Sequence, residues 1–182
     1  MPRVMPRVAR AVAAALALVF LVALAQFVFA RPQVETRLPR SANDPVGRHD
    51  LADYHYGPTI RVSSVNWASH LHPAYLVDRM RATSGRERWE SAPKDPAPWA
   101  EVELDRAHDI DEVVIDLTVV IPGLKVECFA GPRSGESLLF TSNTESSRHV
   151  KISCPGTDRV RVTFLPGAGN TVSVQELEVW GT

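Results

Sequence analysis

The 182-residue sequence has no excess of charge of either sign. Twenty basic and 21 acidic side chains leave a formal net charge of −1. Proteins that bind nucleic acid through its phosphates usually carry a basic excess, because Lys and Arg make those contacts. The balance therefore argues against nucleic acid as a partner.

The sequence also lacks the short motifs that carry common catalytic chemistry. It contains no glycine-rich phosphate loop, no His-Glu-x-x-His, no Cys-x-x-Cys and no Gly-x-Ser-x-Gly. Carboxylates are plentiful, but no pair stands out as an acid/base couple. With neither a nucleophile nor a metal trio in view, we predict that the protein is not an enzyme.

Long apolar runs are absent except for one near the N-terminus. Residues 1–10 carry three arginines and no acid, and residues 11–30 hold a single polar side chain, Gln26. This pattern is typical of an export signal, and the run approaches the roughly 20 residues that span a bilayer. We expect residues 1–30 to be either a cleaved signal peptide or an inner-membrane anchor that contacts the membrane. In both cases the remainder lies outside the cytoplasm, secreted or anchored. A core helix of a cytosolic protein is the alternative.

The next segment has little apolar patterning. Residues 31–57 are dominated by Arg, Pro, Asp and Asn. This composition predicts a linker between the hydrophobic segment and a folded domain at residues 58–182.

Within residues 58–182, apolar and polar side chains alternate as in half-buried strands. The alternation is clearest over residues 113–121, 124–130, 150–154 and 160–164. Turn sequences rich in Pro and Gly separate these runs, and only residues 73–82 suggest a short helix. Many short strands at this spacing predict an all-β fold, an antiparallel β-sandwich or jelly roll.

Only two cysteines are present. Cys128 and Cys154 both fall on the apolar side of their predicted strands. Neighbouring inward cysteines in an exported domain are expected to form a disulfide. Two free buried thiols are the alternative.

The last predicted strand changes phase. Val172 and Val174 occupy even positions, whereas Leu177 and Val179 occupy odd ones. A slip of one residue indicates a β-bulge that turns Glu176 inward. An inward carboxylate needs a cation or an arginine as its partner, and a solvent-facing Glu176 is the alternative.

Two tryptophans, Trp89 and Trp99, stand on either side of a loop that contains Pro93, Pro96 and Pro98. These prolines exclude a helix interior. Loops held on a rigid scaffold often carry binding sites. The alternative is that both tryptophans only fill the ends of the core.

These segments resemble a known family. The motifs are "RVSSVNWAS", "HPAYLVDRMRAT", Trp89 with Ser91, "WAEVEL" and the final "QELEVWG". Residues 59–181 are in this way similar to the discoidin domain, also called the coagulation-factor C-type domain. That family belongs to the galactose-binding-like jelly rolls. The resemblance implies that Trp89 packs under the loops and that Trp99 opens a core strand.

The resemblance also implies a structural calcium ion between the aspartate turn and the last strand. The matching positions are Asp78, Thr83 and Glu176, whose oxygen atoms suit calcium. The family usually has Gly after the aspartate, and this sequence has Arg79. The guanidinium of Arg79 is therefore an alternative to the cation.

Taken with the export signal, the resemblance implies a non-catalytic module that binds a glycan at the cell envelope. A protein-interaction or structural domain of the envelope, without a sugar site, is the alternative. The glycan would be held by loop side chains at one end of the sandwich. The candidates are Trp67, His70, His72, Arg86 and Arg88.

Overall fold

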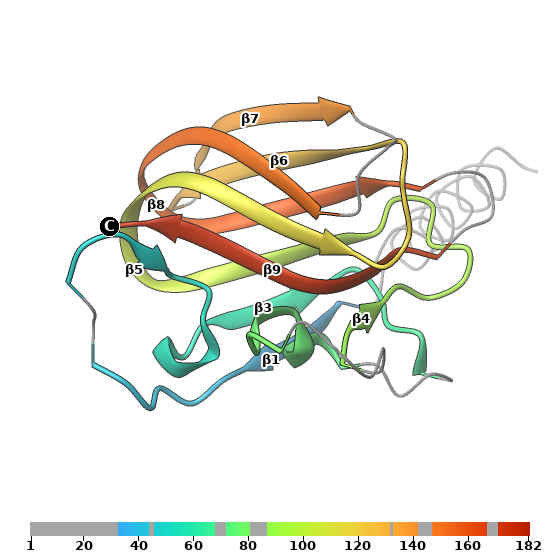
Figure 1. Ribbon diagram of the computed structural model, residues 1–182, viewed down its shortest axis with the longest axis horizontal. Coiled ribbons are helices and arrows are strands. Elements are labelled where there is room, and N and C mark those ends of the chain that lie inside the picture. Colours follow the sequence, from blue (N-terminus) through green and yellow to red (C-terminus); the bar gives the residue numbers. More distant parts are fainter. Residues whose placement is uncertain are drawn as a thin grey trace, which may run out of the picture. The chain divides into compact units, whose positions relative to one another are not determined.

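The computed structural model describes residues 33–43, 46–67, 72–80, 87–131, 133–141, 147–166 and 171–182. These residues form nine strands and two short 3-10 helices (Figure 1). The elements are β1 (Val34–Arg37), β2 (His49–Asp50), η1 (Tyr54–Tyr56), β3 (Thr59–Val62), η3 (Pro73–Val77), β4 (Trp89–Glu90), β5 (Trp99–Leu117), β6 (Gly123–Ala130), β7 (Arg133–Thr141), β8 (Ser147–Leu165) and β9 (Ser173–Gly181). Every strand pair is antiparallel, which confirms the all-β prediction.

The predicted N-terminal hydrophobic helix falls outside the described residues. In the part of the chain that the structure describes, no helix combines the length and apolar character needed to cross a membrane.

Two long strands connect the layers of the sandwich. β5 and β8 are each 19 residues long. Near Trp99–Glu103, β5 lies between β3 and β8, in the layer β1-β3-β5-β8-β6-β7. Beyond Ile110 it lies between β8 and β9, and β9 in turn pairs with β2 and β4. Register shifts separate the two halves, and Figure 1 shows β5 and β8 curling over at the same end.

The core lies between these layers and follows the predicted alternation. Val113, Ile115 and Leu117 of β5 are all buried, as are the apolar positions of β6, β8 and β9. The strand ends at Leu117, so Val119, which the alternation also placed inside, lies on a loop and is 41% exposed. The apolar period therefore predicted which side chains of β5 reach the core, but not where the strand stops or that Val114 and Asp116 on the opposite face are also buried.

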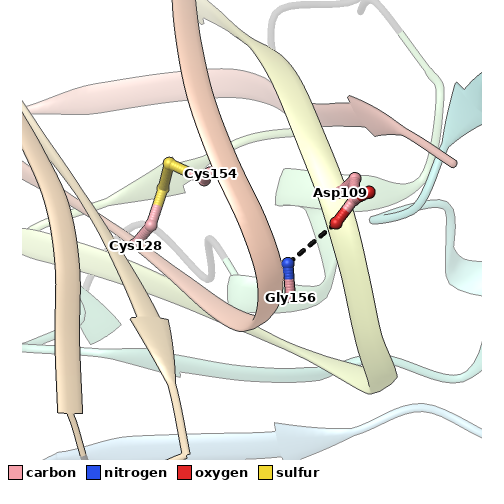
Figure 2. The surroundings of a disulfide bond; sticks show 4 residues. All are labelled: Asp109, Cys128, Cys154 and Gly156. Atoms are coloured by element: carbon pink, nitrogen blue, oxygen red, sulfur yellow. Dashed lines mark hydrogen bonds between the residues drawn. A yellow bond between two sulfur atoms is a disulfide. The ribbon is translucent and has the colours of Figure 1, made fainter.

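The disulfide joins Cys128 of β6 to Cys154 of β8, with the two Cα atoms 6.2 Å apart (Figure 2). This confirms the predicted pairing. Close by, the Gly156 backbone N–H donates to the Asp109 carboxylate across 2.8 Å. Gly156 has a φ of 61°, in the left-handed region that favours glycine, so it permits the sharp bend of β8.

The folded unit begins earlier than the sequence predicted, because residues 33–57 are not a free linker. The compact unit extends from Gln33 to Thr182. β1 pairs with β3, β2 pairs with β9, and Leu51 and Ala52 are buried in the core. The Asp50 carboxylate accepts hydrogen bonds from the backbone N–H groups of Ala52 and Val179. Hydrogen bonds and a few scattered apolar residues, Val34, Leu38, Leu51 and Ala52, attach this segment to the sheet and the core. Because these residues are not regularly spaced, they give no sustained apolar period.

Candidate functional site

The loop between the two tryptophans is fixed by a single carboxylate. Asp95 Oδ2 accepts hydrogen bonds from the hydroxyls of Ser63 and Ser64, each at 2.6 Å. Those hydroxyls accept in turn from the backbone N–H groups of Trp99 and Ala92, each at 3.1 Å. The loop is therefore held against the segment after β3, and this end of the sandwich is a rigid scaffold.

The two tryptophans have different positions. Trp89 is fully buried, packs against Phe164, and donates its indole N–H to the Ser64 carbonyl across 2.9 Å. It lies under the loops, as the family resemblance implied. Trp99 is only half-buried, and the Arg161 guanidinium lies 4.4 Å from the centre of its ring. Trp99 opens the core strand β5, as the family resemblance implied, and its own side chain faces outward because Ala100 is the neighbouring core residue. The alternative, that both tryptophans fill the ends of the core, therefore holds for Trp89 but not for Trp99.

A third tryptophan, Trp67, exposes 61% of its surface beside a polar cluster. The neighbouring Asn66 donates its backbone N–H to the Glu90 carbonyl at 2.8 Å and its side-chain amide to the Glu90 carboxylate at 2.6 Å. The other Glu90 oxygen lies 3.6 Å from a guanidinium nitrogen of Arg88. We call Asn66, Trp67, Arg88 and Glu90 the loop cluster. It combines an open aromatic face with an amide, a carboxylate and a guanidinium, a set that suits a ring edged by hydroxyl groups.

The remaining predicted ligand residues contribute less. His72 caps η3, and its Nδ1 accepts a hydrogen bond from the Ala74 backbone N–H across 3.1 Å. The neutral ring then carries its proton on Nε2, which is left as a donor on an exposed residue. His70 and Arg86 lie outside the described residues. The sequence analysis did not predict Asn66 and Glu90 as site residues. They are 24 positions apart, and nothing in a single sequence indicates that their side chains meet.

The predicted metal site centres on Glu176. A register shift in the pairing of β5 with β9 just before Glu176 confirms the predicted bulge. Glu176 is 1% exposed, and neither of its carboxylate oxygens has a hydrogen-bond partner among the described residues. Burial, reinforced by the charge of Asp78, raises the pKa of Glu176 to about 9.

The residues beside Glu176 are arranged as a turn. Asp78 ends η3 and accepts a hydrogen bond from the Met80 backbone N–H across 2.8 Å, and burial raises its pKa. The next residue, Arg79, has a φ of 60°. Its guanidinium lies 2.9 Å from the buried carboxylate of Asp53 and is half exposed. The described contacts of Arg79 thus neutralise Asp53 and not Glu176.

A hard cation suits the two oxygens of Glu176 that have no hydrogen-bond partner among the described residues. Among the described residues, no group of three or more His, Cys, Asp or Glu side chains is placed to hold a metal ion. Thr83, the third predicted ligand, lies outside those residues. Within them, the two unpaired oxygens of Glu176 and the nearby Asp78 are the atoms that fit calcium.

Comparison with known proteins identifies the fold. No family model matches the sequence, and no curated protein does. A fucose-binding module of Streptococcus pneumoniae matches at a TM-score of 0.61 and 18% identity, over 77% of this chain and 100% of that one. The chain has a galactose-binding-like jelly-roll fold. The lectin domain of lectinolysin, solved with Lewis B antigen, matches this jelly roll at a TM-score of 0.59 and 15% identity, over 74% of this chain and 97% of that one.

The same jelly roll also occurs inside larger proteins. A chitosan-binding module from a Paenibacillus chitosanase/glucanase matches at a TM-score of 0.57 and 18% identity, over 74% of this chain and 100% of that one. A Ruminococcus gnavus fucosidase of glycoside hydrolase family 29 matches at a TM-score of 0.58 and 18% identity over 74% of this chain, but this covers only 27% of the enzyme. The jelly roll therefore corresponds to one part of that enzyme.

Proposed function

We propose that this protein is a non-catalytic glycan-binding module, exported and held at the cell envelope. The observation that carries the proposal is the loop cluster, in which the exposed Trp67 directly follows Asn66, and Asn66 is hydrogen-bonded to Glu90, the partner of Arg88. A sugar ring has one apolar face and an edge of hydroxyl groups. The indole would stack against the apolar face, while the amide, carboxylate and guanidinium would exchange hydrogen bonds with the hydroxyls.

The scaffold around Trp67 supports this proposal. Asn66 is tied to Glu90 by two hydrogen bonds, and Trp89 is anchored to the Ser64 carbonyl just before them. A pre-organised site loses less conformational entropy when it binds, so more of the contact energy appears as affinity. Solved structures that share the fold include proteins named as fucose-binding, Lewis B-bound and chitosan-binding. They support a glycan as the ligand class.

Export is supported by two independent features. The arginine-rich start and the apolar run at residues 11–30 have the pattern of an export signal. The Cys128–Cys154 disulfide is of a kind that persists mainly in oxidising compartments. Together they favour a protein that is secreted or anchored in the inner membrane and acts outside the cytoplasm.

We also propose that calcium binds at Asp78, Thr83 and Glu176 in a structural role. The ion would supply the positive charge that the buried Glu176 carboxylate needs. Asp78 would add a second carboxylate from the turn after η3. Held together in this way, the turn would be fixed against β9.

The test is a glycan array probed with the full-length chain, kept in a detergent without a sugar headgroup. We expect the wild-type chain to bind at least one glycan, and Trp67→Ala to abolish the signal, because the stacking surface is lost. Tyr54→Ala is the matched control, since Tyr54 is also an exposed aromatic residue but lies on η1. Equal binding by wild type and Trp67→Ala would refute the loop cluster as the site.

A protein-interaction domain of the envelope is the second candidate. It is favoured by Val119 and Val120, which are 41% and 50% exposed on the loop after β5. Two results together would support this alternative over glycan binding. No glycan on the array would bind, and an envelope protein would cross-link to that loop in cells and be lost from the cross-linked product in Val120→Asp.

A further inference from the structure

The outer face of the layer that contains β1, β3, β5 and β8 carries two adjoining cavities. One has a volume of about 590 Å³ and the other about 410 Å³. Arg61 and Glu103 line both, and they form an ion pair where the cavities meet. We call the two cavities together the sheet groove. The loop cluster residues do not line either cavity.

Strand register lines the groove with alternating charges. One row of paired residues crosses four strands: Glu35 of β1, Arg61 of β3, Glu101 of β5 and Arg161 of β8. Each of them is the register partner of the next. Each neighbouring pair is in contact: the nitrogen–oxygen distances are 2.7, 3.3 and 2.6 Å in that order. Glu101 is 1% exposed at the centre of this row, and Arg159 approaches it from the side at 3.9 Å.

The arginines of the groove are held in place by aromatic rings as well as by carboxylates. The Arg161 guanidinium stacks 4.4 Å from the centre of the Trp99 ring, and that of Arg159 stacks 4.7 Å from the centre of the Phe129 ring. Arg159 also donates to the Gly131 carbonyl across 3.1 Å. Donors that are already fixed in this way lose little conformational entropy when a ligand binds.

Stability alone is a weak reason for this arrangement. Exposed ion pairs contribute about 0–1 kcal/mol each, and a buried ion pair can often be replaced by apolar side chains without loss of stability. Each guanidinium has five N–H donors, and the described contacts of Arg61, Arg159 and Arg161 use only some of them. The groove therefore presents rigid donors beside rigid acceptors.

The charges of the groove select the class of ligand. The smaller cavity is lined by three arginines and three acids: Arg61, Arg159, Arg161, Glu101, Glu103 and Asp158. The larger cavity has the same balance: Arg37, Arg40, Arg61, Glu35, Glu103 and Asp105. A charged polymer would meet like charges in either cavity, whereas an uncharged ligand rich in hydroxyl groups would meet both donors and acceptors.

We propose that the sheet groove is a second glycan-binding surface, which takes an uncharged oligosaccharide laid across β1, β3, β5 and β8. It extends the proposed function to a second face of the jelly roll. The two adjoining cavities would together accommodate several sugar units, whereas the loop cluster offers one aromatic face for a single sugar ring. The groove would thus bind several consecutive units of an oligosaccharide, and the loop cluster would bind one unit.

The test is isothermal titration of the full-length chain, in a detergent without a sugar headgroup, with hexasaccharides of equal length. The uncharged probes are xylohexaose, mannohexaose and cellohexaose, and the acidic probe is hexagalacturonate. Arg159→Gln and Glu103→Gln alter the groove, and neither removes the close partners of Glu101. Trp67→Ala alters the loop cluster. Arg48→Gln is the matched control, because Arg48 is an ion-paired arginine that pairs with Asp111 outside the groove.

We expect at least one uncharged hexasaccharide to bind, and Arg159→Gln and Glu103→Gln each to weaken it at least about tenfold, the usual effect of losing a hydrogen bond to a charged group. Trp67→Ala and Arg48→Gln should leave groove binding unchanged.

Loss of all binding in Trp67→Ala alone would overturn the groove but leave the proposed function standing. Binding that survives Trp67→Ala and is lost in Arg159→Gln would refute the loop cluster but keep the groove. Preference for hexagalacturonate, or no binding by any uncharged probe, would overturn the groove.

Discussion

The carboxyl groups of Glu176 and Asp78 lie close enough for the charge of Asp78 to raise the pKa of Glu176. One sits on the bulged strand β9 and the other on the turn after η3. Two carboxylates that approach each other in a buried place repel unless a proton or a cation separates them. The relationship therefore makes the stability of this region depend on what neutralises Glu176.

The first prediction is that calcium stabilises the folded protein. A cation that binds only the folded state raises the melting temperature as its free concentration rises, by about 2.7 kcal/mol at a hundredfold excess over its dissociation constant. Glu176→Gln should abolish this response in melting curves recorded with calcium or with a chelator. Glu127→Gln, on β6, is the control and should keep it.

A flat response in the wild-type protein would contradict the calcium site. Arg79→Ala also removes a partner of the buried Asp53 carboxylate, which would keep only His55, so some loss of stability is expected whatever neutralises Glu176. The calcium response is therefore the deciding measurement, and Arg79→Ala should leave it unchanged.

The second prediction concerns the disulfide. It closes a loop with a sequence separation of 26 residues, and the chain-entropy model assigns about 3–4 kcal/mol to such a cross-link. The double variant Cys128→Ala and Cys154→Ala should lower the free energy of unfolding by about this amount in urea titrations. Reductant should destabilise the wild-type protein but leave the double variant unaffected. Peptide mapping that finds two free thiols in exported protein would contradict the disulfide in its native compartment.

The third prediction is a loss of stability in acid that depends on Glu112. Its carboxylate accepts from Lys151 at 2.7 Å, from His149 at 3.0 Å and from Arg48 at 2.6 Å, and these contacts lower its pKa to about 2. As the pH falls from about 4.5 towards 2, the unfolded chain binds a proton that the folded chain does not, so the free energy of unfolding falls. This contribution is present above about pH 4.5 and is lost as the pH falls through 2.

Glu112→Gln removes the titrating group. The variant should be less stable than wild type near pH 6, and the two should converge as the pH is lowered to about 2, when unfolding is followed in urea at each pH. Parallel curves over this range would contradict the assignment to Glu112.

The fourth prediction is that the folding unit starts near residue 33. A fragment of residues 33–182 should fold with the circular dichroism of an antiparallel β protein. A fragment of residues 58–182 should unfold at a lower urea concentration, because it lacks β1, β2 and the Asp50 hydrogen bond to the Val179 backbone. Equal midpoints for the two fragments would show that residues 33–57 contribute nothing to stability.

Several features of the fold follow from local sequence. Successive side chains of a strand point to opposite faces, so the parity of Val113, Ile115 and Leu117 is enough to predict which face of β5 packs into the hydrophobic core. The same rule placed Cys128 and Cys154 inside, and the change of parity before Glu176 predicted the bulge. These predictions held because each depends on neighbouring residues alone.

Other features depended on contacts between distant residues. Residues 33–57 resemble a linker because Asp50 attaches them through hydrogen bonds to backbone groups, and these leave no apolar period. The guanidinium that covers the outward ring of Trp99 comes from Arg161 on a different strand. Glu90 joins the loop of Trp67 to that of Arg88 across 24 positions, which no spacing rule predicts.

The sequence by itself thus determined the core-facing positions of β5, β6, β8 and β9, the disulfide partners and the bulge, since side-chain parity is a local property of the backbone. The tertiary structure decided how β5 and β8 bend across two layers, and which polar side chains meet at the loop cluster and in the sheet groove. Those arrangements follow from strand order and register. Register is set by closing the whole sheet, because a strand must satisfy its hydrogen bonds and bury its apolar face at the same time.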